Sequence, residues 1–308
     1  MLPIQAFIND VGPRDGLQSQ SVILSVPERR ELISLIISTG IKHIEVGSFV
    51  SATAVPAMAG TDQVIAPFLV DTQYPQNQFS FSVLIPNVRG FQAAKTAHVK
   101  NINFVICSTD TMNQKNVRKN TDELVAELQQ VCSLAAEDSI TINAYISTAW
   151  DCPFEGVVSA QKIVSLAEQL LKAGVSKIIL SDSIGSADPK RVRQLVSEVK
   201  TLTAVHNIGC HFHDTRSLAL ANVFASLEEG VTWFDSSIGG LGGCPFAPGA
   251  SGNLATEDLV LLLEQQGIHT GVNALALIQA IDTIQAKFAV KCNGGKTFQW
   301  QKSKLLKQ

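Results

Sequence analysis

Two histidines, His211 and His213, stand two residues apart in a stretch of strand-like sequence. Side chains alternate between the two faces of a β-strand, so both imidazoles point the same way. Two imidazoles on one face can ligate a metal ion if that face is turned inward and other ligands converge on it. The alternative is a pair of ordinary polar residues on an exposed strand. The elements around the pair decide between the two interpretations.

Alternating apolar runs and amphipathic stretches predict eight strand–helix units. The expected strands cover residues 7–11, 41–46, 79–85, 101–107, 141–147, 177–180, 207–213 and 233–238. The expected helices cover residues 26–40, 55–66, 87–96, 121–137, 159–173, 188–202, 215–229 and 256–266. Apolar strands alternating with helices indicate a parallel sheet, and eight units of this length favour a closed (β/α)8 TIM barrel. An open doubly wound sheet is less favoured, because no G-x-G-x-x-G motif follows the first strand.

We predict one domain, 1–308, with the barrel over about residues 5–270 and a short C-terminal helical extension over residues 271–308, in which we expect one more helix. In a TIM barrel the carboxyl ends of the strands carry the active site. Polar residues follow or end the predicted strands there: Arg14, Asp15, Glu45, Ser48, Tyr145, Ser147, Asp182, Ser183, His211, His213, Asp214, Cys244 and Asn253. Each has an ordinary explanation alone, but their convergence at one end of the barrel favours a metal site.

The candidate metal ligands are Asp15, His211, His213 and Asn253. This set contains oxygen and imidazole ligands without a thiolate, which suits Mg²⁺ or Mn²⁺; Zn²⁺ is possible but less favoured. Such an ion can chelate a hydroxyl and a carbonyl together and lower the pKa of the hydroxyl. Arg14 adds a fixed positive charge suited to an enolate oxygen or a carboxylate.

Cys244 lies in the glycine-rich run 239–252, which indicates a mobile lid that brings a thiol over the site. The alternative is a plain flexible loop with a buried, inert cysteine.

Composition limits the classes of partner and the compartment that we expect for this protein. A formal net charge of −3 predicts no nucleic-acid partner. No apolar run is long enough to cross a membrane, and we see no signal peptide. The six cysteines lack CxxC spacing, which argues against a zinc knuckle or a disulfide scaffold and favours a reducing, cytoplasmic compartment.

Three stretches carry a resemblance to a known family. They are the run Val11-Gly12-Pro13-Arg14-Asp15-Gly16-Leu17-Gln18, the run Cys210-His211-Phe212-His213-Asp214-Thr215, and residues 239–258 with their Gly-Gly-Cys-Pro and Ser-Gly-Asn motifs. Smaller matches lie at residues 44–51 and 152–156. The chain resembles the hydroxymethylglutaryl-CoA lyases, within the wider group of metal-dependent carbon–carbon lyases and Claisen synthases built on TIM barrels.

The resemblance implies a reaction and a role for each site residue. The expected reaction is retro-Claisen-type cleavage of (S)-3-hydroxy-3-methylglutaryl-CoA to acetoacetate and acetyl-CoA. Asp15, His211, His213 and Asn253 would hold Mg²⁺ or Mn²⁺, and Arg14 would stabilise the enolate of the departing acetyl-CoA. Cys244 would act in proton transfer from the lid. Glu45 and Asp182 would orient the substrate hydroxyl, the metal or water and assist proton transfer. Substrate contacts are expected from Arg14, Gln18, Ser48, Tyr145 and Glu257. A homodimer and a place in leucine degradation or ketone-body formation are further expectations.

The chain departs from the family pattern where the turn Gly-Asp-Thr-Ile-Gly reads Ser181-Asp182-Ser183-Ile184-Gly185. Arg216-Ser217 and Ser21 also differ, and residues 293–300 match nothing familiar. A lyase for a larger 3-hydroxy-3-alkylglutaryl-CoA is therefore an alternative. A Claisen synthase or aldolase is a second alternative, although the Cys244 lid argues against it. A catalytically silent metal- or acyl-CoA-binding protein is a third.

Overall fold

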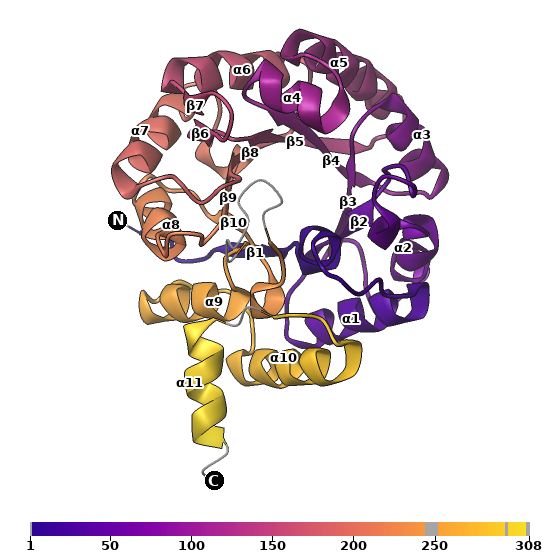
Figure 1. The fold of residues 1–308 in the computed structure, drawn as a ribbon, viewed down its shortest axis with the longest axis vertical. Coiled ribbons are helices and arrows are strands. Elements are labelled where there is room, and N and C mark those ends of the chain that lie inside the picture. The colour runs from indigo at the N-terminus through magenta and orange to yellow at the C-terminus, as the bar shows by residue number, and fades with distance from the viewer. Residues whose placement is uncertain (1, 244–251, 293–294, 306–308) are drawn as a thin grey trace.

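The computed structural model describes residues 2–243, 252–292 and 295–305. Eight parallel strands close into a barrel in the order β1-β10-β9-β8-β5-β4-β3-β2, with helices around the outside (Figure 1). The strands are β1 (Phe7–Asp10), β2 (His43–Ser48), β3 (Ser80–Ile85), β4 (Asn101–Cys107), β5 (Thr141–Ser147), β8 (Lys177–Asp182), β9 (Ile208–Phe212) and β10 (Trp233–Ser236). This confirms the predicted TIM barrel.

The outer ring consists of helices that follow the strands. They are α1 (Val26–Ser38), α2 (Thr61–Val70), α3 (Val88–Thr96), α4 (Asp110–Val117), α5 (Thr121–Glu137), α6 (Ala160–Lys172), α7 (Pro189–Val199), α8 (Ala219–Glu228) and α9 (Thr256–Gln265). The C-terminal extension holds two helices, α10 (Ala274–Phe288) and α11 (Lys296–Leu305), so the expectation of one helix was wrong. Figure 1 shows α11 extending away from the barrel beside α9.

Local sequence explains where the helices begin. Ser25 and Glu28 form a capping box at α1, and Asn120 and Glu123 form another at α5, so each pair satisfies two backbone N–H groups. The Asp188 side chain accepts hydrogen bonds from the first turn of α7. These capped starts match the sequence prediction closely.

Several elements differ from the prediction. Helix α2 begins at Thr61, because Gly60 adopts a left-handed conformation with φ 70° that ends the preceding turn. Helix α4 and the small hairpin of β6 (Asp151–Cys152) and β7 (Gly156–Val157) were not predicted. Both are short, and α4 is mostly polar, so neither carries a hydrophobic period long enough to recognise.

The apolar core lies between the strands and the helices. Outward-facing strand side chains such as Ile44, Phe104 and Ile178 are fully buried there. The side chains inside the barrel are instead largely polar: Asn9, Glu45, Ser82, Asn103, Asn143 and Asp235. Branched apolar residues usually fill a TIM-barrel interior. The polar filling here gives the carboxyl end of the barrel a hydrogen-bonded base.

The amino end of the barrel is closed by aromatic rings. The His43 ring lies 4.7 Å from the Trp233 ring and 5.8 Å from the Phe7 ring, measured between centroids.

No helix in the described part of the chain has the length and apolar character that a membrane span requires.

Candidate active site

Asp15, His211 and His213 come together at the carboxyl end of the barrel. Asp15 lies in a short π-helical turn, Gly12–Gly16, directly after β1, whereas His211 lies on β9 and His213 just beyond it. One ligand atom from each of the three residues lies within 4.8 Å of the other two. His213 Nε2 is 3.9 Å from Asp15 Oδ2. Both imidazoles therefore point into the barrel toward Asp15, as the alternation of the strand predicts.

Asn253 joins this group through backbone pairing. The chain returns after β10 and runs beside the end of β9, where Asp214 N–H donates to Gly252 O over 2.8 Å and Leu254 N–H donates to Phe212 O over 3.1 Å. Asn253 Nδ2 donates to Asp15 Oδ2 over 2.8 Å. Asn253 Oδ1 is buried and has no hydrogen-bond partner among the described residues. A buried, unpaired amide oxygen beside a carboxylate and two imidazoles fits a divalent cation.

Electrostatics keep the carboxylate of this group charged. Burial raises the pKa of Asp15, but the Arg14 charge and the two histidines outweigh this, so its pKa lies well below the usual range. Burial lowers the pKa of His211, but Asp235 more than offsets that effect and the net shift is upward. An ionised Asp15 beside two imidazoles can hold a divalent metal ion.

Arg14 lies between two carboxylates. Its Nη1 donates to Asp15 Oδ1 over 2.6 Å, and its Nε donates to Glu45 Oε2. Nη1 also lies 3.3 Å from Gln18 Oε1. Burial lowers the pKa of Arg14, but the negative charges of Glu45 and Asp15 raise it by more, so the net shift is upward. The guanidinium therefore stays charged beside the metal ligands.

Glu45 is fully buried, and a chain of two asparagine side chains inside the barrel hydrogen-bonds to its carboxyl group. Asn103 Nδ2 donates to Glu45 Oε1 over 2.8 Å, and Asn143 Nδ2 donates to Asn103 Oδ1 over 3.1 Å. Burial raises the pKa of Glu45, and Arg14 and Asn103 counteract only part of that shift. Glu45 is thus a carboxyl group fixed between a cation and a neutral amide.

Asp235 supports His211 from inside the barrel, and the sequence analysis missed it. Asp235 Oδ2 lies 3.1 Å from His211 Nδ1, and the same oxygen accepts from the Tyr145 hydroxyl over 2.6 Å. Asn9 Nδ2 donates to Asp235 Oδ1 over 2.9 Å. A carboxylate on Nδ1 leaves Nε2 of the imidazole for a metal ion. Alternation within the predicted strand 233–238 could have placed Asp235 on the inward face, but its contact with His211 follows only from the register of β10 against β9.

Asp182 lies outside the metal group. Its Oδ1 and Oδ2 accept from the backbone N–H groups of Ser186 and Ala187, each over 2.9 Å. Burial raises its pKa, and the two backbone N–H groups partly oppose this. In this structure the carboxylate shapes the turn after β8.

The other expected substrate residues are dispersed around the mouth and below it. Tyr145 lies beneath His211, and its hydroxyl donates a hydrogen bond to Asp235. Ser48 is buried at the end of β2. Gln18 is exposed just beyond Arg14. Glu257 accepts from Gly239 N–H over 3.1 Å and from Gly295 N–H over 2.8 Å, so it ties the C-terminal extension to the turn after β10. Cys244 lies outside the described residues.

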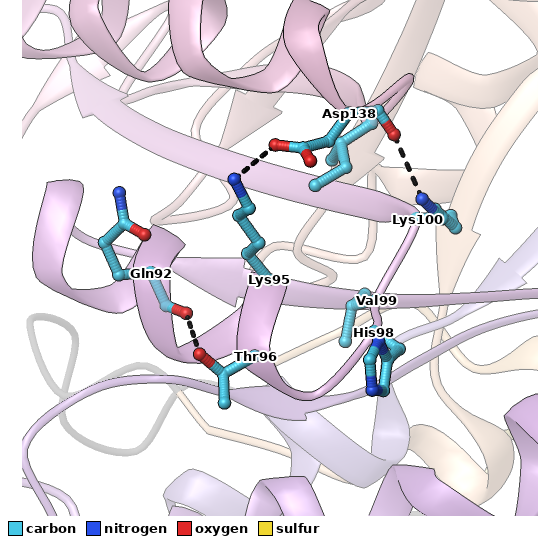
Figure 2. A pocket seen from close by; sticks show the side chains of 8 residues that line it. Gln92, Lys95, Thr96, His98, Val99, Lys100 and Asp138 are labelled. Atoms are coloured by element: carbon cyan, nitrogen blue, oxygen red, sulfur yellow. Dashed lines mark hydrogen bonds and ion pairs between the residues drawn. The ribbon is translucent and has the colours of Figure 1, made fainter.

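A hollow of about 350 Å³ lies at the amino end of the barrel, between the ends of α3 and α5 (Figure 2). Its lysines already have partners. Lys95 Nζ lies 2.5 Å from Asp138 Oδ2, and Lys100 Nζ donates to Asp138 O over 3.0 Å. This hollow has no part in the metal group.

The fold and the ligand group define a TIM-barrel protein with a candidate divalent-metal centre at the carboxyl ends of its strands. The HMGL-like family model matches residues 5–284, and the chain belongs to that family.

Named relatives give the family its chemistry. The chain is 40% identical over 279 residues to the hydroxymethylglutaryl-CoA lyase of Pseudomonas mevalonii, covering 90% of this chain and 91% of that protein. It is 38% identical over 285 residues to the (R)-citramalyl-CoA lyase of Chloroflexus aurantiacus, covering 91% of this chain and 90% of that protein. A solved HMG-CoA lyase from Acinetobacter baumannii, in complex with coenzyme A and 3-methylmalate, superposes with a TM-score of 0.88 at 36% identity, covering 94% and 93% of the two chains. Relatives of this kind support a CoA-lyase enzyme.

Proposed function

We propose that the protein cleaves (S)-3-hydroxy-3-methylglutaryl-CoA to acetoacetate and acetyl-CoA. The observation that carries the proposal is the group of Asp15, His211 and His213 with the Arg14 guanidinium 2.6 Å from Asp15. A metal-ligand group beside a fixed cation suits a reaction that develops negative charge on two oxygens in turn. The hydroxymethylglutaryl-CoA lyases among the relatives support the same substrate.

The bond changes follow from the substrate. The C3 hydroxyl loses its proton, the C3–oxygen bond becomes a ketone, and the electron pair of the C2–C3 bond moves to C2. The products are acetoacetate and the enolate of acetyl-CoA, which becomes acetyl-CoA when C2 takes up a proton. A bound divalent cation, Mg²⁺ or Mn²⁺, would supply Lewis acidity toward the hydroxyl and carbonyl oxygens, held by Asp15, His211, His213 and Asn253.

The chain's own residues would divide the remaining work. Arg14 would stabilise the enolate oxygen, because its charge is buried and already fixed by Glu45. Glu45 and Asp182 would orient the hydroxyl and assist removal of its proton, and Cys244 would transfer a proton to the departing carbon.

Substrate contacts are also part of the proposal. Gln18, Ser48, Tyr145 and Glu257 would contact or enclose the substrate. We further propose a cytoplasmic location and a homodimer; light scattering on the purified protein tests the homodimer directly.

A lyase for a related 3-hydroxyacyl-CoA is the second candidate. The (R)-citramalyl-CoA lyase relative, at 38% identity, favours it. A panel of hydroxymethylglutaryl-CoA, citramalyl-CoA and 3-hydroxy-3-alkylglutaryl-CoAs, each assayed with Mg²⁺ or Mn²⁺, separates the two. The first proposal expects the highest kcat/KM for hydroxymethylglutaryl-CoA. A higher value for citramalyl-CoA would favour the second, and net condensation without cleavage would indicate a synthase.

A further inference from the structure

Two apolar side chains, Leu84 and Val105, lie at the mouth of the barrel on β3 and β4. Register places both inside the barrel. Leu84 pairs with Ser48, and Val105 pairs with Tyr145, whose hydroxyl reaches Asp235 in the barrel interior. Their outward neighbours Phe104 and Ile106 are instead fully buried beneath the helices. Leu84 and Val105 thus face the site and not the outer core.

These two residues lie across the barrel from the metal ligands. In the closed strand order, β3 stands opposite β9, which carries His211, and β4 stands opposite β10. Val105 is only partly buried although it lies inside a barrel, whereas Leu84 beside it is buried, with 8% of its surface exposed. The accessible part of this apolar surface, mainly Val105, lies opposite a polar metal group and can receive the part of a ligand that points away from the metal.

Ser48 marks the edge of this surface. The Ser48 Oγ is buried and has no hydrogen-bond partner among the described residues. Ser48 is the register partner of Leu84 on the neighbouring strand. A buried hydroxyl without a partner is costly unless a ligand supplies one. The opposite edge carries the hydroxyls of Ser147 and Ser183, whose Oγ atoms lie 2.6 Å apart. The apolar surface is therefore bordered by polar groups on both sides.

We propose that Leu84 and Val105 form the wall against which the 3-alkyl group of the substrate packs. This inference rests on the proposed function, in which the 3-hydroxyl and the thioester carbonyl face the metal ligands. The alkyl group on C3 then points toward β3 and β4. Because Val105 is short and its surface is still partly open, the wall accepts alkyl groups longer than methyl, and residue 105 sets their maximum length.

The test compares hydroxymethylglutaryl-CoA with 3-hydroxy-3-butylglutaryl-CoA. One methylene in an apolar pocket changes discrimination by about 10-fold or more. Val105→Phe is expected to lower kcat/KM for the butyl substrate at least about 10-fold more than for the methyl substrate. Leu84→Ala is expected to shift the ratio of the two kcat/KM values in favour of the butyl substrate.

The matched control is Phe104→Leu, which changes side-chain volume on the same strand but on the outward face. It is expected to leave the ratio unchanged, and Mn²⁺ affinity measured by calorimetry is expected to stay the same in all three variants. If Val105→Phe changes kcat/KM equally for both substrates, or if the wild-type enzyme cleaves only the methyl substrate, the proposed role of Leu84 and Val105 is wrong. If the wild type cleaves neither substrate, the proposed function itself is wrong, and the role of these two residues with it.

Discussion

Asp235 Oδ2 lies 3.1 Å from His211 Nδ1 and also accepts the Tyr145 hydroxyl, so one buried carboxylate fixes the orientation of a metal-ligand imidazole. Replacing it by Asn puts an amide NH₂ where one of the two acceptor oxygens stood. Loss of such a partner typically weakens metal binding by about 10- to 100-fold. We expect Asp235→Asn to weaken Mn²⁺ binding by a factor in that range in titration calorimetry.

Tyr145→Phe is the control for this prediction. It removes one donor to Asp235 but keeps the Asp235–His211 contact, so Mn²⁺ affinity should change by no more than a few-fold. Equal Mn²⁺ affinity in wild type and Asp235→Asn would show that His211 does not depend on Asp235.

Asn103→Val removes the only side-chain amide that donates to Glu45 Oε1 in the described part of the chain. An unsatisfied buried acceptor costs about 1–3 kcal/mol of the free energy of unfolding, and we expect Asn103→Val to lose an amount in that range. We also expect a lower kcat, because Glu45 loses the donor that holds its carboxyl group beside Arg14, and little change in Mn²⁺ affinity, because Asn103 touches no metal ligand.

Asn143→Val serves as the comparison, since Asn143 donates to Asn103 and not to Glu45. Its effect on kcat should be smaller. A loss as large as that of Asn103→Val would instead indicate a general packing defect in the barrel interior.

Cys244→Ala tests the proposed proton transfer from the glycine-rich segment. The substitution removes the thiol but no metal ligand, so turnover should fall while Mn²⁺ affinity stays near wild type. Steady-state assays and calorimetry on the same preparation measure both. Wild-type turnover in the variant would remove Cys244 from the mechanism.

Glu257 makes stability depend on pH. Burial raises its pKa from 4.5 to about 7, so between these values the folded protein holds a proton that the unfolded chain has released. The free energy of unfolding therefore decreases as pH rises through this window and levels off above it. Glu257→Gln cannot titrate and should flatten this part of the curve.

Urea denaturation at several pH values between 4.5 and 8 measures the effect. Gln also loses one of the two backbone contacts, so the variant should be less stable by about 1 kcal/mol at the acid end of this range, and the deficit should disappear as pH rises. A wild-type-minus-variant difference that stays constant with pH would contradict the raised pKa.

Much of the fold could be predicted because its elements carry local signals. Apolar strand runs and capped helix starts such as Ser25 and Asp188 predict the order of the elements, and the closed barrel places β1 and β9 on either side of β10. The approach of Asp15 to His211 and His213 follows from this topology alone.

The missed features depend on partners distant in sequence. Asp235 and Asn103 lie in the middle of strands, and only strand register shows that they face His211 and Glu45. Glu257 carries no local sign that its carboxylate binds backbone N–H groups 18 and 38 residues away.

The most direct test of the account is acetoacetate formation from hydroxymethylglutaryl-CoA by the purified protein. We expect acetoacetate and acetyl-CoA in equal amounts with Mg²⁺ or Mn²⁺, loss of both with a chelator, and recovery when the cation is returned. Full activity of the chelated protein, or no acetoacetate under any of these conditions, would contradict the account.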